Sequence, residues 1–236
     1  MKFNGVDAFS ATMRRQWATA VGMSYLMRMI VDPHIESYIA SLDGLADPVL
    51  ADMEDRAAKN SFPIIGRHAG ALLAMLARCI GARRVLELGS GYGYSALWFA
   101  RALAQDGTVT CTDLSRDNRA LALDFFRRAG VERKISFHVG DALSFARAQK
   151  GPYDIILNDI DKDSYPASVE VAVPLLRSGG LFITDNALWS GKVADEGVTD
   201  ATTQAIRTFN KVIFSRGDLE ALMIPIRDGV AVCRKK

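Results

Sequence analysis

Strand-like and helix-like segments alternate from residue 84 to residue 184, and this alternation constrains the fold more than any other feature of the chain. Longer stretches with helical spacing separate short apolar runs. Strands joined in this way lie parallel, with right-handed crossovers between them. We therefore expect an α/β fold built on a doubly wound, mostly parallel sheet. Its expected strands include residues 84–88, 108–112, 135–139, 155–157 and 181–184.

The two ends of the chain depart from this alternation. Residues 217–236 predict two strands around Arg227-Asp228-Gly229, and the Asp-Gly step is typical of a hairpin, so these strands should pair antiparallel at the sheet edge. Before residue 80 the pattern is helical, with helix starts expected at Asp32-Pro33 and Asp47-Pro48. We divide the chain into an N-terminal helical extension (residues 1–60) and one main domain (residues 61–236).

The first 40 residues are rich in methionine and aromatic side chains for an extension. Met23, Met27 and Ile30 fall at helical spacing. Three interpretations stay open for this segment: packing onto the main domain, a lid over a substrate, or a contact between two subunits. Methionine-rich surfaces suit the last two because methionine adapts its shape to apolar partners.

A glycine-rich turn follows the first strand of the alternating region. Gly89, Gly91 and Gly93 form the pattern G-x-G-x-G, and a helical stretch comes next. Glycines in such a turn let the backbone bend sharply and approach a ligand closely. The next strand ends in Asp113, about 24 residues after Gly89, which is the separation expected of an acid that binds ribose hydroxyls. An ordinary helix-capping turn is the alternative interpretation.

The charge around this turn separates two classes of cofactor. Glu87, Asp113 and Asp141 would form an acidic rim, which would repel the pyrophosphate of a nicotinamide dinucleotide. S-adenosylmethionine carries no phosphate, and its sulfonium and ammonium groups make it a net cation. Acids can pair with its ammonium group and its ribose. The pattern, the spacing and the charge together favour S-adenosylmethionine.

A second group of polar residues follows two later strands. Asp159 comes directly after one apolar run, and Asp185 and Asn186 come after the next. In an open α/β sheet, ligands bind at the carboxyl ends of the strands. Two carboxylates and an amide oxygen are hard ligands suited to Mg²⁺ or Ca²⁺. Lys162 follows Asp159 by three residues and could serve as a base beside a metal. Solvated loop acids and a surface lysine are the alternative.

Five segments together resemble a known family, the cation-dependent O-methyltransferases, which include caffeoyl-CoA and catechol O-methyltransferases and many bacterial relatives. The resemblance covers roughly residues 60–236. The paired aspartate segments and the Leu-Trp-Ser-Gly run are its most specific parts, whereas most S-adenosylmethionine enzymes share the glycine turn. The segments are Glu87–Ser95, Asp159–Tyr165, Pro174–Gly180, Asp185–Gly191 and Ile224–Cys233.

The resemblance implies a Rossmann-like sheet of seven strands and a role for particular residues. Asp159, Asp185 and Asn186 match the metal ligands, for Mg²⁺ or another divalent cation such as Mn²⁺ or Ca²⁺, and Lys162 matches the general base. A homodimer is also expected from the family. The matches to cofactor contacts are Gly70, Glu87, Gly89, Gly91, Ser95, Asp113, Asp141, Ala142 and Asp159.

The expected reaction is transfer of a methyl group from S-adenosylmethionine to a hydroxyl of a catechol-like aromatic molecule. A bound dication would chelate two neighbouring oxygens of this acceptor and lower the pKa of the phenol from about 10. Lys162 would either accept the proton or stabilise the phenolate as a positive charge. Trp189 follows the metal pair by three residues, so we expect it to contact the acceptor; packing in the core is the alternative.

Composition argues against several other classes. Lys and Arg number 29 against 27 Asp and Glu, so no basic footprint indicates a nucleic-acid partner. No apolar run is long enough to span a membrane, and no signal peptide is recognisable. Cys111 and Cys233 lie in apolar runs, as small buried residues do in a reduced compartment, so we expect a cytoplasmic protein.

Three rival functions remain to be weighed against methyl transfer to a small molecule. A nicotinamide oxidoreductase is expected to carry the pattern G-x-G-x-x-G and no metal ligands. A nucleic-acid methyltransferase is expected to present a basic face. A non-catalytic module that binds S-adenosylmethionine would not need Lys162 or the metal ligands. A screen for methyl acceptors separates the last rival from an enzyme.

Overall fold

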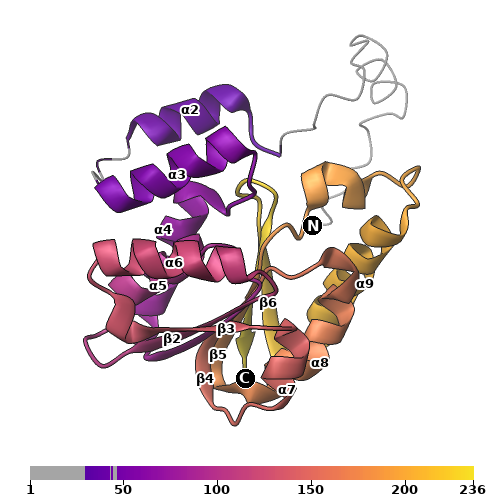
Figure 1. The fold of residues 1–236 in the computed structure, drawn as a ribbon. Helices are drawn as coiled ribbons and strands as arrows, with labels where there is room; N and C mark the ends of the chain where they lie inside the picture. Colours follow the sequence, from indigo (N-terminus) through magenta and orange to yellow (C-terminus); the bar gives the residue numbers. More distant parts are fainter. Residues whose placement is uncertain (1–29, 43, 45–46) are drawn as a thin grey trace, which may run out of the picture.

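In the described part of the chain, a central sheet has seven strands in the order β3-β2-β1-β4-β5-β7-β6 (Figure 1). The computed structural model describes residues 30–42, 44 and 47–236, so the predictions for the first 29 residues lie outside the described part. The strands are β1 (Arg84–Leu88), β2 (Thr108–Asp113), β3 (Ile135–Val139), β4 (Tyr153–Asn158), β5 (Leu176–Thr184), β6 (Leu219–Ile224) and β7 (Val230–Lys235).

The pairing of these strands confirms the predicted mostly parallel sheet. Strand β1 pairs in parallel with both β2 and β4, and β3 and β5 continue the parallel order outward. Strand β7 runs antiparallel between β5 and β6, which confirms the predicted C-terminal hairpin. The strand order reverses between β1 and β4, so the carboxyl ends of the two strands border a crevice of the kind in which such sheets bind ligands.

Strand β5 is longer than the predicted residues 181–184. It begins at Leu176, and its pairing with β4 jumps from Tyr153–Leu176 to Ile155–Leu181. The intervening residues include Gly179, whose φ is +75°. Such an irregularity inserts residues into one strand without ending it, which is why the Ser-Gly-Gly stretch does not terminate β5.

Helices cover both faces of the sheet (Figure 1). Helices α3 to α6 lie on one face and α7 to α9 on the other, and each layer has its own apolar core. Phe99 and Phe126 are fully buried in the first core, and Tyr165, Phe182 and Phe209 in the second. The bounds are α2 (Pro33–Ser41), α3 (Pro48–Asn60), α4 (Gly66–Cys79), α5 (Tyr94–Ala102), α6 (Arg116–Arg128), α7 (Ala142–Arg147), α8 (Tyr165–Leu175) and α9 (Ala201–Ser215).

Short 3₁₀ helices complete the connections. They are η1 (Glu132–Lys134), η2 (Lys162–Ser164) and η3 (Trp189–Ala194). The last two follow β4 and β5, so they lie next to the segments that carry the predicted metal ligands.

Both helix starts predicted at Asp-Pro steps are confirmed. The Asp32 side chain accepts a hydrogen bond from the His34 amide at the start of α2, and Asp47 caps α3 in the same way. Helix α3 buries Leu50 and Met53 in the first core. The Tyr92 hydroxyl also donates to the Met53 carbonyl at 2.9 Å. The domain boundary at residue 60 stays a prediction, although α3 packs directly against the glycine turn.

Two predictions from composition also have structural counterparts. Cys111 and Cys233 are buried and carry free thiols, as expected of small core residues. Among the helices that the structure describes, none is long and apolar enough to cross a bilayer.

Candidate functional site

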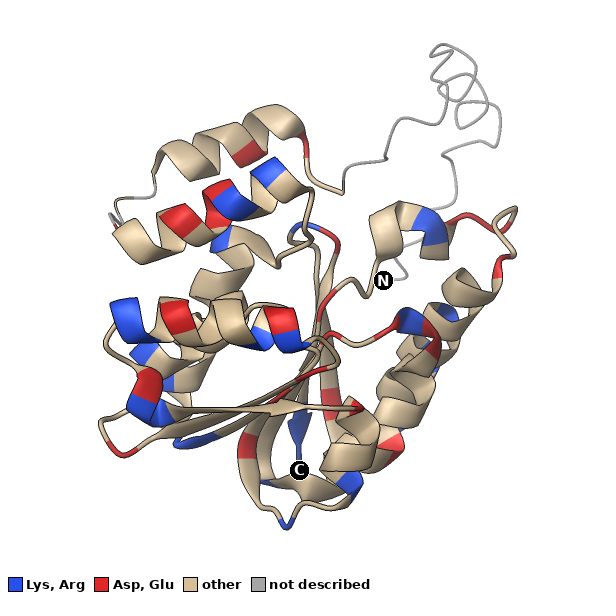
Figure 2. Ribbon diagram, viewed as in Figure 1, with Lys and Arg blue, Asp and Glu red and all other residues tan. Residues whose placement is uncertain are grey.

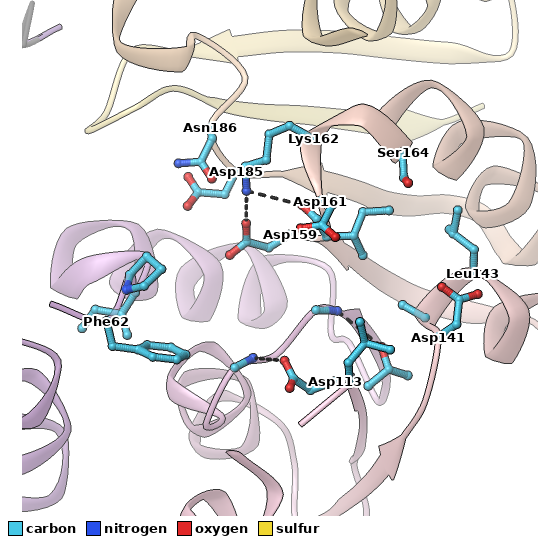
Figure 3. A pocket seen from close by; sticks show the side chains of 18 of the residues that line it. Phe62, Asp113, Asp141, Leu143, Asp159, Asp161, Lys162, Ser164, Asp185 and Asn186 are labelled. Atoms are coloured by element: carbon cyan, nitrogen blue, oxygen red, sulfur yellow. Dashed lines mark hydrogen bonds and ion pairs between the residues drawn. The ribbon is translucent and has the colours of Figure 1, made fainter. Parts of the chain in front are cut away.

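A cavity of about 390 Å³ opens where the central strands end. The predicted cofactor residues Gly89, Gly91 and Asp113 line it, together with Asp159 and Asp185 from the predicted metal group. The close-up in Figure 3 shows the two groups facing one another across this space. Two sets of residues that are far apart in the sequence therefore share one cavity.

The glycine turn is held in place by the end of β2. The amide groups of Gly89 and Ser90 donate to the Thr112 carbonyl at 3.1 and 2.9 Å. The Gly91 amide donates to Asp113 Oδ2 at 3.0 Å. These bonds satisfy the backbone of the turn, and Gly89 and Gly91 line the cavity.

Asp113 sits at the centre of a small hydrogen-bond network. Its Oδ1 accepts from the Ser115 amide at 2.8 Å and from Asn118 Nδ2 at 3.0 Å. The carboxylate is thus oriented before any ligand binds. Asp141 and Ala142 lie on the same cavity wall at the start of α7. Hydrogen bonds from Ser144 hold the pKa of Asp141 below its ordinary value.

Glu87 lies in the core behind the glycine turn and does not belong to the cavity wall. Its side chain is fully buried and accepts a hydrogen bond from the Ser95 hydroxyl. Burial raises the pKa of Glu87 to about 7. Its Oε2 atom has no hydrogen-bond partner within the described residues. The predicted cofactor contacts of Glu87 and Ser95 therefore stay predictions.

Gly70 also lies away from the cavity wall. It packs in α4 against the indole of Trp98 from α5, where a Cβ atom would overlap the ring. Close packing of α4 on α5 therefore accounts for a glycine at this position. Its predicted contact with the cofactor stays a prediction.

Asp159, Lys162, Asp185 and Asn186 come together at one end of the cavity (Figure 3). Lys162 Nζ donates to Asp159 Oδ1 at 2.9 Å and to the Ile160 carbonyl at 3.4 Å. The Tyr165 hydroxyl donates to the Asp185 carbonyl at 2.9 Å. Adjacent parallel strands β4 and β5 place their ends side by side, which explains how residues of two segments meet here.

The two carboxylates of this group disfavour one another's ionisation. Burial, and then the nearby charge of Asp159, raise the pKa of Asp185 to about 7. Burial also raises the pKa of Asp159, against the opposing charges of Lys162 and Arg227. Figure 2 shows acidic positions gathered where the central strands pass into their loops. A dication bound between the carboxylates would relieve this repulsion.

The donor set fits a hard divalent cation by its chemistry. Asp159 and Asp185 offer carboxylates, and Asn186 offers an amide oxygen, as Mg²⁺ sites do. In the described residues there is no cluster of three or more His, Cys, Asp or Glu side chains that could hold a metal. The candidate site therefore depends on the amide of Asn186 as its third ligand.

Trp189 occupies the start of η3 and is half-buried. It packs against the second core and is not part of the cavity wall. Lys192 Nζ lies 5.4 Å from the centre of its ring. This placement matches the packing interpretation, and the predicted substrate contact stays a prediction.

The sequence interpretation missed one wall of the cavity. Phe62, Pro63 and Ile64, which precede α4, line it together with Arg227 from the β6–β7 turn. Arg227 Nη1 donates to the Ile64 carbonyl at 2.5 Å, across 163 residues of sequence. The Arg-Asp-Gly turn was recognised as a hairpin signal, but nothing local shows that a hairpin tip reaches the site.

The family is established by comparison with known proteins. The model of the O-methyltransferase family matches residues 39–236. The chain belongs to the O-methyltransferase family. As a member it is a methyltransferase enzyme, and the resemblance inferred from the sequence motifs is confirmed.

This O-methyltransferase is similar to proteins from plants and bacteria. Caffeoyl-CoA O-methyltransferase 2 of Zea mays is 34% identical over 200 residues, which cover 79% of this chain and 76% of the relative. A catechol O-methyltransferase of Niastella koreensis is 31% identical over 196 residues, covering 80% of this chain and 89% of the relative.

Solved structures share the fold of this O-methyltransferase. TomG from Streptomyces achromogenes, an O-methyltransferase of tomaymycin synthesis solved with S-adenosylmethionine (SAM), aligns with a TM-score of 0.78 at 30% identity. The alignment covers 86% of this chain and 96% of TomG. A Bacillus cereus O-methyltransferase in complex with SAH gives a TM-score of 0.78 at 28% identity, covering 86% and 97%.

Proposed function

We propose that the enzyme transfers the methyl group of S-adenosylmethionine to a hydroxyl of a small catechol-like molecule, with the help of a divalent cation. One observation carries the proposal: the glycine turn with Asp113, and the Asp159–Asp185–Asn186 group with Lys162, open onto one cavity. Its volume of about 390 Å³ lies in the range of small-molecule sites.

The cofactor half of the proposal rests on geometry and charge. The backbone of Gly89 and Gly91 lines the cavity, and Asp113 presents an oriented carboxylate of the kind that binds ribose hydroxyls. The wall is acidic, which suits a net cation. The structures of TomG with S-adenosylmethionine and of the Bacillus cereus enzyme with SAH support the same cofactor.

The acceptor half of the proposal rests on the oxygen ligands. Asp159, Asp185 and Asn186 would hold the divalent cation, whose chemistry is to bind neighbouring oxygens of the acceptor and lower the pKa of the phenol. The relatives named for caffeoyl-CoA and catechol support an aromatic acceptor of this class. A cytoplasmic homodimer remains our expectation for the assembled enzyme.

We further propose that Lys162, as a neutral amine, takes the proton that leaves the acceptor; a dication held by Asp159 would weaken the present ion pair and favour the neutral form. Its side chain is 17% exposed, lines the cavity and is held by Asp159, so its Nζ stays close to the oxygen ligands. The protein must also keep the acceptor oxygen, the methyl carbon and the sulfur in line. The glycine turn follows β1 and Asp159 follows β4, and the pairing of these two strands supports such an alignment.

A radiolabelled methyl-transfer screen over catechol-bearing acceptors, with and without Mg²⁺, tests the proposal. We expect labelled product from at least one vicinal diphenol with Mg²⁺, and none from the matched monophenol, which cannot chelate. Transfer to RNA or DNA but to no small molecule would contradict the proposal. Binding of S-adenosylmethionine with no transfer to any acceptor would instead indicate a non-catalytic module.

A further inference from the structure

The turn between β6 and β7 is joined by hydrogen bonds to the loop after β5. The Leu188 amide donates to the Asp228 carbonyl at 2.9 Å, and the Ala187 amide donates to the Gly229 carbonyl at 2.9 Å. Gly229 has a φ of +84°, and a Cβ atom there would overlap Leu188. The hairpin tip therefore lies directly against the loop that begins with Asn186.

The Asp228 side chain binds this loop at two points. Its Oδ2 accepts from Asn186 Nδ2 at 3.2 Å, and its Oδ1 accepts from the Ser190 amide. Asn186 and Ser190 both have positive φ, at +55° and +52°. Among non-glycine residues asparagine adopts this conformation most readily, whereas serine does so less often, and Asp228 binds both residues in it.

The chemistry of the pair decides which end of the Asn186 amide faces Asp228. A carboxylate only accepts hydrogen bonds, whereas an amide has a donor end and an acceptor end. The donor end of Asn186 must therefore point to Asp228, which leaves the oxygen for another partner. With the amide reversed, Asn186 would point two N–H groups at the candidate cation and could not bind it.

We propose that Asp228 is a positioning residue that turns the amide oxygen of Asn186 toward the candidate metal site. The inference rests on the proposed function, because it needs Asn186 to be a ligand. Partners behind metal ligands typically change metal affinity about 10- to 100-fold when they are removed. Asp228 would act in this way although it donates no atom to the metal.

Binding of Mn²⁺ to the full chain, followed by electron paramagnetic resonance, measures this role without any turnover. In D228N the amide at position 228 can still accept from Ser190, but its N–H groups face those of Asn186 and favour the reversed amide. We expect Mn²⁺ affinity to fall about 10- to 100-fold. D163N is the matched control: Asp163 is exposed and outside the cavity wall, and its loss should change affinity less than about threefold.

A swap of the two side chains provides the second arm. In N186D/D228N the amide at position 228 donates to the carboxylate at position 186, and net charge is unchanged. We expect the swap to bind Mn²⁺ at least as tightly as the wild type, because position 186 then offers an oriented carboxylate, and N186D alone to bind more weakly than the swap, because two carboxylates face one another. If D228N fails to fold, the swap decides: affinity equal to or above that of the wild type and of N186D supports the proposal, and affinity below either overturns it.

The outcomes separate this inference from the proposed function. Mn²⁺ binding by the wild type that is unchanged in D228N would overturn the role of Asp228 and leave the metal site standing. A wild type that binds no Mn²⁺ would overturn the metal site itself, and the role of Asp228 with it. Binding of S-adenosylhomocysteine by each variant verifies that the cofactor half remains folded.

Discussion

The backbones of Gly89 and Asp159 lie so close together that a Cβ atom on Gly89 would collide with the Asp159 carbonyl oxygen. Alongside this contact, the Asp159 amide donates to the Leu88 carbonyl at 2.8 Å. The turn proposed to bind the cofactor therefore touches the segment proposed to bind the metal. In the proposed complex, this backbone contact between neighbouring strands would fix how far the cofactor site lies from the metal site.

This contact predicts the effect of G89A. Gly89 has a φ of +81°, so alanine would add both backbone strain of about 1–2 kcal/mol and an overlap costing about 1–3 kcal/mol. The control is G130A, because Gly130 has a φ of +68° with no atom within 4 Å of a Cβ. We expect G89A to lower the free energy of unfolding clearly more than G130A in urea titrations. Equal losses would mean that the collision does not matter.

Asp113 should dominate the polar recognition of the cofactor. D113A removes the acceptor for the Gly91 amide and for any ribose hydroxyl, so S-adenosylmethionine binding should weaken by about 1–3 kcal/mol. Isothermal titration calorimetry measures the change. D117A, which removes an exposed acid from the same region, should bind as wild type does. Unchanged affinity in D113A would reject the assignment.

Lys162 should act as a base and not only as a charge. K162M should lower kcat about 10²- to 10⁴-fold, the usual contribution of general base catalysis. K162R keeps the positive charge but a guanidinium does not accept a proton at neutral pH, so we expect a comparable loss. The exposed Lys211 provides the control variant K211M. Near-normal turnover in K162R would assign Lys162 the role of stabilising the phenolate electrostatically.

Removal of divalent metal should separate the two halves of the site. A chelator should abolish turnover with a catechol-like acceptor, and added Mg²⁺ should restore it, because the oxygen ligands serve the acceptor. Cofactor binding in calorimetry should largely survive, since Asp113 and the glycine turn supply none of the proposed metal ligands. Full activity in excess chelator, with metal content measured as negligible, would exclude the cation-dependent reaction.

Glu87 should make stability fall as pH rises. Its pKa of about 7 in the folded protein lies above its ordinary value of 4.5, so the folded state holds more protons between these values. The contribution of Glu87 is therefore full below pH 4.5 and is lost as pH rises toward 7, by about 3 kcal/mol.

The variant E87Q tests this pH dependence. It should remove the share of Glu87, about 3 kcal/mol, from the pH profile of the free energy of unfolding and leave the share of Asp185, whose pKa is also raised to about 7, whereas E132Q, an exposed control, should keep the wild-type profile. Urea unfolding at pH 5 and pH 7.5 measures the change. A profile of E87Q that matches the wild type would show that Glu87 does not hold its proton in the folded state.

Local patterns in the sequence were sufficient to predict most strands and helices and the polar residues that follow the strands. Apolar runs predicted β1 to β4, and the acids and glycines directly after them lie at the cavity because side chains after a parallel strand always emerge at the same edge of the sheet. The Asp-Pro steps predicted α2 and α3, since capping and the fixed φ of proline act within a few residues.

Tertiary structure alone decided which distant residues meet and which predicted residues reach the cavity. The hairpin tip brings Asp228 to Asn186 across 42 residues and Arg227 to Ile64 across 163. Helix packing places Gly70 against the indole of Trp98, and the core buries Glu87 behind the glycine turn. Backbone preference and side-chain alternation are local and can be read from the sequence. The neighbours and solvation of a side chain depend on segments that come together only when the whole sheet folds.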